Sequence, residues 1–245
     1  MVVNLHRGKP LVKRIGLISP ALRHFILFME LMMKDFLDSL SKSAWETSCA
    51  RYNASRRLKV REIFSTISLA LIGLSGIILS LIQYFWITDI NPKLNILITA
   101  FSIILSMLLI IISLIEWGVA SGAKSEALFR NAELLNEHER KISLFKNCLK
   151  EEIMDDDYKY IDNLRDEYEK IKSTCTFNHS PVDYEYHKIV KSRYYIAHTS
   201  ESFSFWRVLK GRVNYSISSI WGYLIIWSIV AIFFFKVLKV IASLY

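Results

Sequence analysis

The chain has 245 residues, 52% of them hydrophobic, and a formal net charge of +8 at pH 7. Its mean hydropathy of +0.27 is high for a soluble domain, and its basic residues lie beside apolar blocks without a nucleic-acid recognition motif, so we expect contact with a lipid bilayer and no direct nucleic-acid binding. Three cysteines without a CxxC pair argue against a disulfide framework and against a zinc site.

The first predicted element lies in an N-terminal segment, residues 1–42. Apolar side chains recur at helical spacing from Leu22 to Leu40, and charged residues such as Glu30 and Lys34 fall between them. This pattern predicts an amphipathic helix that carries too many charges to span a membrane. Such a helix either lies on the membrane surface or packs on a cytosolic domain, and packing is the more ordinary outcome.

Two predicted transmembrane helices follow, at residues 63–88 and 94–116. Each is long enough as a helix to cross a hydrocarbon core of about 30 Å. Only residues 89–93 separate them, so the two spans must run antiparallel. Basic residues crowd the chain before the first span, from Arg51 to Arg61, whereas the link contains only Lys93. The positive-inside rule therefore places both ends of this hairpin in the cytoplasm.

The segment after the hairpin, about residues 122–195, is predicted to form cytosolic helices. Apolar residues keep a three-four spacing from Leu128 to Ile153, which is typical of a coiled-coil seam, and a helix from Tyr158 to Lys172 has the same spacing. Two such helices form either an antiparallel pair within a chain or a bundle between subunits. A third charge-free run, residues 213–235, predicts another transmembrane helix.

These elements together predict an all-α membrane protein: a transmembrane helical hairpin, a cytosolic helical bundle and a third, C-terminal transmembrane helix. Residues 43–200 form the central domain, residues 1–42 precede it, and residues 201–245 form the C-terminal segment with the third span. We expect a multi-pass protein of the inner (cytoplasmic) membrane with its N-terminus in the cytoplasm.

Polar side chains follow one face of each hairpin helix at helical spacing. We call this set the polar stripe, and its members are Ser68, Ser75, Gln83, Thr99, Ser102, Ser106, Ser113 and Glu116. Small hydroxylated residues allow helices to approach closely and to hydrogen-bond across the interface. The same residues could instead face water in a pore built from several hairpins. Glu116 would then either cap a helix end or contribute to a ring of carboxylates that favours cations.

No enzyme motif is present. The sequence contains no P-loop, no GxSxG, no HExxH and no paired Cys/His set, so we expect no catalytic residues, no cofactor and no metal. His179 and His187 are too loosely spaced around Asp183 for a metal site, and ordinary hydrogen-bonded or solvated histidines are expected instead.

Several short segments point to a known family. WETSCARYNASRRL (45–58) precedes the hairpin, and FRNAELL (129–135), YEKI (168–171) and NHSPVDY (178–184) follow it. Over about residues 43–197 this arrangement resembles the SLATT family, the two-transmembrane effectors associated with SMODS and SLOG proteins. The positions carried over from the family pattern are Trp45, Arg51, Arg57, Asn178, His179 and Asp183.

The resemblance implies a membrane effector of a bacterial anti-phage or conflict system. Such an effector oligomerises and forms a pore when a sensor or nucleotide signal triggers it, and the partner would be a sensor, a nucleotidyltransferase or a reverse transcriptase encoded nearby. The six carried-over residues are expected to brace the cytosolic helices against the base of the hairpin. The third span departs from the two-span core of the family. The alternatives are a non-conducting membrane scaffold or sensor subunit that docks a cytosolic partner, and an enzyme of lipid or nucleotide chemistry.

Overall fold

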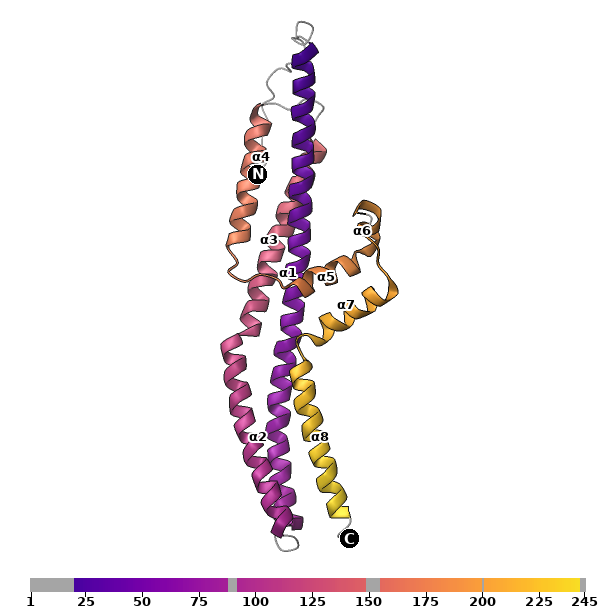
Figure 1. Ribbon diagram of the computed structural model, residues 1–245. Coiled ribbons are helices and arrows are strands. Elements are labelled where there is room, and N and C mark those ends of the chain that lie inside the picture. The colour runs from indigo at the N-terminus through magenta and orange to yellow at the C-terminus, as the bar shows by residue number, and fades with distance from the viewer. Residues whose placement is uncertain (1–19, 88–91, 149–154, 200, 243–245) are drawn as a thin grey trace.

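The computed structural model describes residues 20–87, 92–148, 155–199 and 201–242, and every regular element among them is a helix (Figure 1). The helices are α1 (Pro20–Ile82) with its π-helical extension η2 (Gln83–Ile87), α2 (Pro92–Val119), α3 (Ser121–Cys148), α4 (Asp155–Ser173), α5 (Pro181–Val190), α6 (Ser192–Thr199), α7 (Phe205–Ile217) and α8 (Trp221–Ala242). The predicted all-α membrane fold with a helical hairpin and a third C-terminal span is confirmed.

Helix α1 is continuous over 63 residues. The N-terminal amphipathic segment, the basic segment and the first span are therefore one helix, and residue 42 lies inside it. No proline or glycine occurs between Pro20 and Gly73, so nothing in the sequence ends the helix earlier. The side chains of Leu22 and Glu30 lie outside the described part of the molecule, as do residues 1–19.

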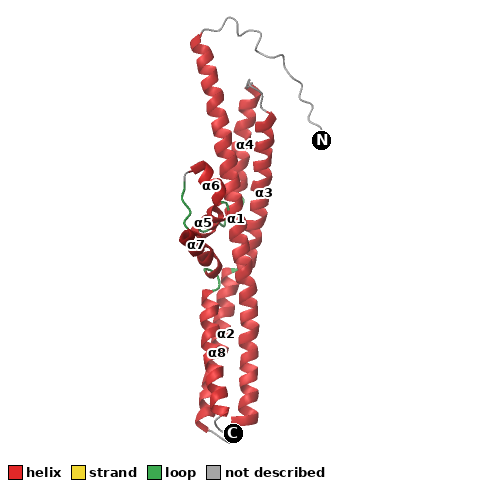
Figure 2. Ribbon diagram, turned by 90° about the vertical axis from the view of Figure 1, so that its right-hand side faces the viewer, coloured by secondary structure: helices red, strands yellow, loops and turns green. Residues whose placement is uncertain are grey.

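The N-terminal half of α1 packs with α3 and with α4, which runs antiparallel to α3 (Figure 2). We call this three-helix arrangement the polar bundle. Its core consists of Leu37, Leu40, Ala44, Leu135, Ile142, Ile161, Leu164 and Tyr168. The last part of the amphipathic segment, with Leu37 and Leu40, packs in this core, whereas Phe28, Leu31, Met32 and Phe36 are exposed. The seam of α3 is buried within a single chain. Leu149 and Ile153, also predicted for this seam, lie outside the described residues.

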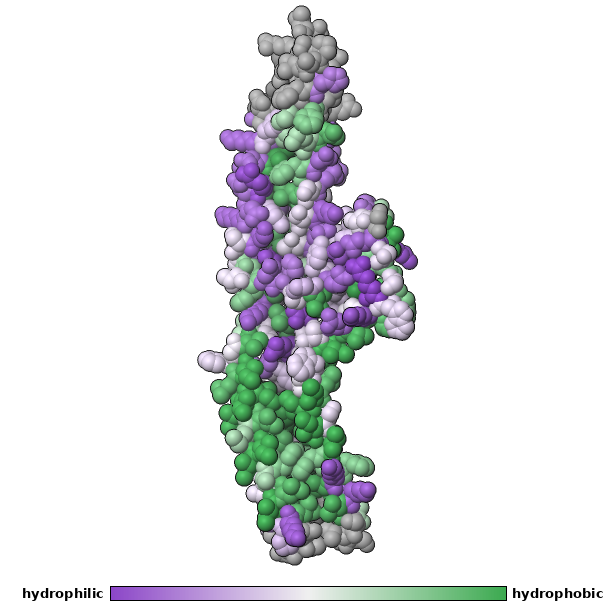
Figure 3. Space-filling view, in the orientation of Figure 1, coloured by the Kyte–Doolittle hydropathy of each residue, from purple (hydrophilic) through white to green (hydrophobic). Residues whose placement is uncertain are grey.

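The C-terminal half of α1 packs with α2 and α8 in a second bundle, which we call the membrane bundle. Its buried residues are Ile72, Leu79, Leu94, Ile98, Leu105, Ile112, Tyr223, Val230 and Val237. All three helices are long and apolar enough to cross a membrane. On the face that Figure 3 shows, this half of the molecule is mostly hydrophobic and forms what we call the hydrophobic belt, whereas the described surface of the other half is mostly hydrophilic.

The third span differs in position from the prediction. The sequence placed it at residues 213–235, whereas α8 covers Trp221–Ala242, and residues 213–217 belong to the separate helix α7. A turn at residues 218–220 divides the two helices. The charge-free run extends across this turn, so hydropathy alone could not reveal the break.

Exposed aromatic side chains mark both ends of the hydrophobic belt. Trp117 at the end of α2 and Trp221 at the start of α8 are 84% and 59% exposed, whereas Tyr84 is exposed at the opposite end. Aromatic rings at these levels are typical of the two membrane–water interfaces. The end marked by Trp117 and Trp221 adjoins the polar bundle, and we call it the inner end of the spans.

Candidate functional site

The first-span half of the polar stripe is directed into the membrane bundle. Ser68 and Ser75 are both buried. The Ser68 hydroxyl accepts a hydrogen bond from Trp227 Nε1 of α8 at 3.0 Å, and Ser75 donates to the carbonyl of Leu71 in its own helix at 2.8 Å. Ser68 therefore joins two helices of one chain, whereas the Ser75 hydroxyl is paired within its own helix.

Gln83 joins the two hairpin helices at the end of the spans far from the polar bundle, which we call the outer end. Its amide nitrogen donates to Asn95 Oδ1 at 2.5 Å and to Thr99 Oγ1 at 2.8 Å, so it contacts two consecutive turns of α2. The Thr99 hydroxyl in turn donates to the carbonyl of Asn95 at 3.0 Å. This cluster keeps three costly polar groups paired near the outer end of the spans.

The second-span half of the stripe lies at the side of the packed face of α2. Thr99, Ser106 and Ser113 are exposed in the single chain, whereas the packed face is formed by the leucine and isoleucine residues of the core. Ser102 is half-buried, and its hydroxyl has no hydrogen-bond partner among the described residues. Ser113 also borders a hollow of about 440 Å³ between the inner ends of α1 and α2. Thr99 and Glu116 therefore contact neighbouring helices at the two ends of this half of the stripe, whereas Ser106 and Ser113 between them stay exposed.

Glu116 connects all three spans at their inner end. Its Oε1 lies 2.8 Å from Arg61 Nη2 of α1, and it also accepts a hydrogen bond from the hydroxyl of Tyr223 in α8. The side chains of Arg61 and Glu116 are 29% and 13% exposed, so solvent screens their attraction only partly. In a single chain the carboxylate is thus engaged in a contact between helices.

Sequence reasoning did not identify Arg61 and Tyr223 as partners of Glu116. A usable signal exists, because Arg61 precedes the first charge-free run and Glu116 ends the second. Two antiparallel spans of similar length bring these two positions to the same level in the membrane.

A second polar cluster joins α1 to α5. Asp183 is fully buried, and its two carboxylate oxygens accept from Arg57 Nε at 2.7 Å and from Arg57 Nη2 at 3.0 Å. Arg57 Nη1 also donates to the hydroxyl of Ser219 at 3.1 Å, in the turn that precedes α8. A bidentate arginine–carboxylate pair fixes both distance and orientation. This pair links the polar bundle, α5 and the start of the third span.

The NHSPVDY segment positions the Asp183 carboxylate of this cluster through hydrogen bonds of its own. Ser180 is the N-cap of α5, Pro181 occupies the first turn, and the backbone N–H and hydroxyl of Ser180 both donate to Asp183 Oδ2, at 2.9 and 2.8 Å. Proline is favoured at this position because no helical donor is lost there. The capping interaction holds the Asp183 carboxylate ready for Arg57.

Arg51 precedes Arg57 in α1 and therefore lies farther from the spans, within the polar bundle. It donates to Asn131 Oδ1 of α3 and, at 3.4 Å, to the carbonyl of Lys172 in α4. The amide nitrogen of Asn131 donates to the carbonyl of Ile171 at 2.6 Å. Arg51 and Asn131 therefore join α1, α3 and the end of α4.

Trp45 lies in an aromatic cluster between α1, α5 and α6. Its ring meets the rings of His187 and Tyr194 edge-on, with centroid distances of 4.8 and 4.9 Å. The neighbouring Glu46, which sequence reasoning missed, accepts hydrogen bonds from the hydroxyls of Tyr184 and Tyr195 at 3.0 and 2.9 Å. Burial lowers the pKa of His187 to about 4, because the charged imidazole would lose its hydration.

Asn178 and His179 are the least connected of the six carried-over residues. The side chain of Asn178 accepts a local hydrogen bond from the backbone N–H of His179 at 2.9 Å. The His179 ring is partly buried, which lowers its pKa, and its centroid is 6.3 Å from that of Tyr184. In the part of the chain that the structure describes, no group of three or more His, Cys, Asp or Glu side chains is placed to hold a metal ion.

A known family matches most of the chain. The family model for the SMODS and SLOG-associating 2TM effector domain family 5 matches residues 33–237. The chain belongs to this SLATT family. Its members are two-transmembrane effector domains of defence-associated systems. No curated protein and no solved structure matches the chain.

The match also corrects the expectation that the third span lies outside the shared region. Residues 33–237 include most of α8 as well as the hairpin and the carried-over residues. In this SLATT protein α8 hydrogen-bonds to both hairpin helices, through Trp227 to Ser68 and through Tyr223 to Glu116. The third helix is therefore an integral part of the family domain in this chain.

Proposed function

We propose that this SLATT protein is a membrane effector of a bacterial anti-phage or conflict system that oligomerises and forms an ion-conducting pore when a partner triggers it. The observation that carries the proposal is the exposed half of the polar stripe. Thr99, Ser106 and Ser113 repeat at intervals of seven residues along α2 and remain on the surface of the single chain.

The interior of the membrane bundle offers no place for a conducting path. The face of α2 between α1 and α8 consists of buried leucine and isoleucine residues, and Phe101 stacks on Phe233 with a centroid distance of 3.5 Å. A water-filled path would therefore form between chains, where α2 helices of several copies turn their hydroxyls toward a shared axis. Self-association through the seam of α3 is not needed, since that seam is buried within one chain.

The proposed site of action is the inner membrane, with the N-terminus and the polar bundle in the cytoplasm. The basic residues of the inner end support this orientation. It is tested with single cysteines at Lys93, which is exposed, and at Lys124, which is half-buried, and a membrane-impermeant thiol reagent. We expect labelling of Lys93→Cys in intact cells and of Lys124→Cys only after permeabilisation. The reverse pattern would contradict the orientation.

We propose that another protein triggers this chain and that the chain itself catalyses no reaction. The family is named for its association with SMODS and SLOG proteins, which supports a sensor or nucleotidyltransferase partner encoded nearby. The cells that express the chain with such a neighbour should lose membrane potential on triggering, and a voltage-sensitive dye reports this loss.

Leucine substitutions test whether the stripe lines the path. We expect Ser106→Leu combined with Ser113→Leu to reduce ion flux strongly in triggered cells, because two apolar rings would replace hydroxyls at the pore wall. Ser228→Leu is the matched control, since Ser228 is an exposed hydroxyl of α8 that donates to its own helix at 2.8 Å. Equal flux in the stripe variant and the control would reject the pore.

A non-conducting scaffold is the second candidate, and one surface feature favours it. The side of α3 next to α1 has a hollow of about 850 Å³, lined by Tyr52, Leu134, Leu144 and several charged residues. A cytosolic partner could dock there. Triggered protein in vesicles that never releases ions, yet binds its neighbour through this hollow, would favour the scaffold.

A further inference from the structure

Helix α7 is an amphipathic helix whose apolar face is left open. Its sequence, FWRVLKGRVNYSI, places Phe205, Trp206, Leu209, Val213 and Ile217 within one side of the helix. All five are exposed, and Phe205 and Trp206 are 72% and 74% exposed. So many large apolar side chains on a short helix indicate an interaction surface.

The opposite face of α7 is fixed to the rest of the protein. Arg207 donates to Glu185 Oε1 of α5 at 2.8 Å, and Tyr215 stacks on Tyr186 of α5 with a centroid distance of 3.8 Å. Gly211 lies against Ile189 so closely that a Cβ atom would collide with the isoleucine side chain. Since α5 holds this face, the orientation of the apolar face is set by the fold.

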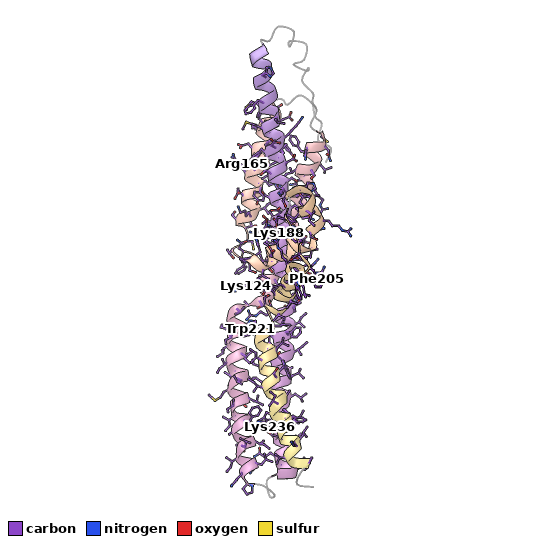
Figure 4. The ribbon with its side chains drawn as sticks, turned by 45° about the vertical axis from the view of Figure 1, so that its right-hand side comes forward. Lys124, Arg165, Lys188, Phe205, Trp221 and Lys236 are labelled. Carbon is purple, nitrogen blue, oxygen red and sulfur yellow. The ribbon has the colours of Figure 1, made fainter. Side chains whose placement is uncertain are left out.

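The fold directs the apolar face toward the level of the membrane. Figure 1 shows α5 on the far side of α7 from the spans, so the face of α7 away from α5 is turned toward them. In Figure 4, Phe205 lies beside the junction of the two bundles, between the levels of Lys188 and Trp221. The turn at residues 218–220 connects α7 directly to the third span.

Two cations flank the apolar face. On a helical wheel Lys210 falls on one edge of this face and Arg212 on the other, and both side chains are exposed. Neither has an ion-pair partner among the residues that the structure describes. Apolar residues between flanking lysine or arginine side chains are the pattern of helices that lie in a membrane interface, where the cations reach lipid phosphates.

We infer that α7 lies in the headgroup region of the membrane, on the side of the polar bundle, with its five apolar side chains among the lipids and Lys210 and Arg212 on anionic headgroups. The helix would act as a lateral anchor that sets the angle between α5 and α8. The occupant of the open face is therefore anionic lipid. This inference does not depend on pore formation.

Quenching of a fluorophore tests the inference on the full chain in vesicles. Cys49, Cys148 and Cys175 are replaced by serine, and a single cysteine at Leu209 or Val213 carries an environment-sensitive fluorophore. Lys159→Cys, an exposed position on α4, is the matched control. Vesicles contain phosphatidylcholine with or without phosphatidylglycerol, and quenching by headgroup-labelled nitroxide lipid is compared with quenching by aqueous iodide.

We expect lipid quenching at positions 209 and 213 to exceed that at position 159 severalfold, and iodide quenching to show the reverse order. Phosphatidylglycerol should increase the lipid quenching, and combining Lys210→Gln with Arg212→Gln should abolish that increase. Iodide quenching equal to the control would place the face in water and overturn the inference. Protection from both quenchers would identify a protein partner or a second copy as the occupant and would also overturn it. An unchanged lipid dependence in the glutamine variant would refute the role of the two cations.

Discussion

Arg61 and Glu116 form an ion pair at the inner end of the hairpin, with 2.8 Å between Nη2 and Oε1. The same carboxylate accepts a hydrogen bond from Tyr223, so one acidic side chain holds three spans together where they meet the polar bundle. Any rearrangement that separates α8 from the hairpin must break this contact or carry it along.

Replacement of Glu116 by glutamine should weaken the membrane bundle. The change removes the charge opposite Arg61, and a hydrogen bond to a charged group contributes about 1.5–3 kcal/mol. We expect a loss of that order in the free energy of unfolding, measured by circular dichroism in detergent. Glu126→Gln is the matched control, because the Arg130–Glu126 pair is exposed and such a change stays within about 0.5 kcal/mol. Equal losses in the two variants would show that the Arg61–Glu116 pair stabilises the fold no more than an exposed ion pair does.

Replacement of Asp183 by asparagine should be more damaging. Arg57 would keep its charge at a largely buried position without a carboxylate, and breaking a buried pair in this way costs about 3–5 kcal/mol. We expect the unfolding midpoint of α5 and its neighbours to fall sharply in urea. Asp162→Asn, in the exposed pair with Arg165, should leave the midpoint almost unchanged. A tolerant response at Asp183 would argue against a bracing role for the Arg57–Asp183 contact.

The buried His187 makes stability depend on pH. Its pKa is lowered from 6.5 to about 4, so the unfolded chain binds the proton more readily than the folded chain between these values. The stabilising contribution is fully present above about pH 6.5 and declines as the pH falls toward 4, by up to about 3 kcal/mol at 1.36 kcal/mol per pKa unit. Thermal unfolding from pH 7 to pH 4 measures this slope. His187→Phe should flatten it, and an equally steep slope in that variant would exclude His187 as the cause.

Ser68 and Trp227 should be energetically coupled across the membrane bundle. Their hydrogen bond of 3.0 Å joins α1 to α8, and comparable bonds between membrane helices contribute about 0.6 kcal/mol on average and up to about 1.7. A double-mutant cycle with Ser68→Ala and Trp227→Phe measures the coupling in detergent. Ser80→Ala serves as the control, because Ser80 donates within its own helix. Strictly additive effects of Ser68→Ala and Trp227→Phe would mean that the bond does not form.

The spans were predictable because their signal is local. An uncharged run of bilayer length must become a helix in lipid, since every backbone N–H and C=O group then needs a partner within its own segment. The same holds for the seam of α3, whose spacing is a property of one helix. The Ser-Pro-x-Asp start of α5 was likewise visible in the sequence as part of the NHSPVDY motif, although its capping role was not assigned.

The partners of the polar residues were not predictable in this way. Ser68 and Ser75 belong to the same stripe as Ser106 and Ser113, yet the first two are buried and the last two are exposed. For Ser68 the difference arises from α8, whose Trp227 donates to its hydroxyl. The break between α7 and α8 has a similar origin, because the contacts of α7 with α5 decide where the third span begins.

The sequence by itself determined the helical class, the membrane location and the family, since these depend on the length, polarity and order of residues within single segments. Only the tertiary structure decided that Glu116 meets Arg61 and Tyr223, that Arg57 meets Asp183, and that the face of α7 stays open. The physical reason is that short-range forces between side chains act on neighbours in space, and the folded chain brings together groups that lie far apart along it.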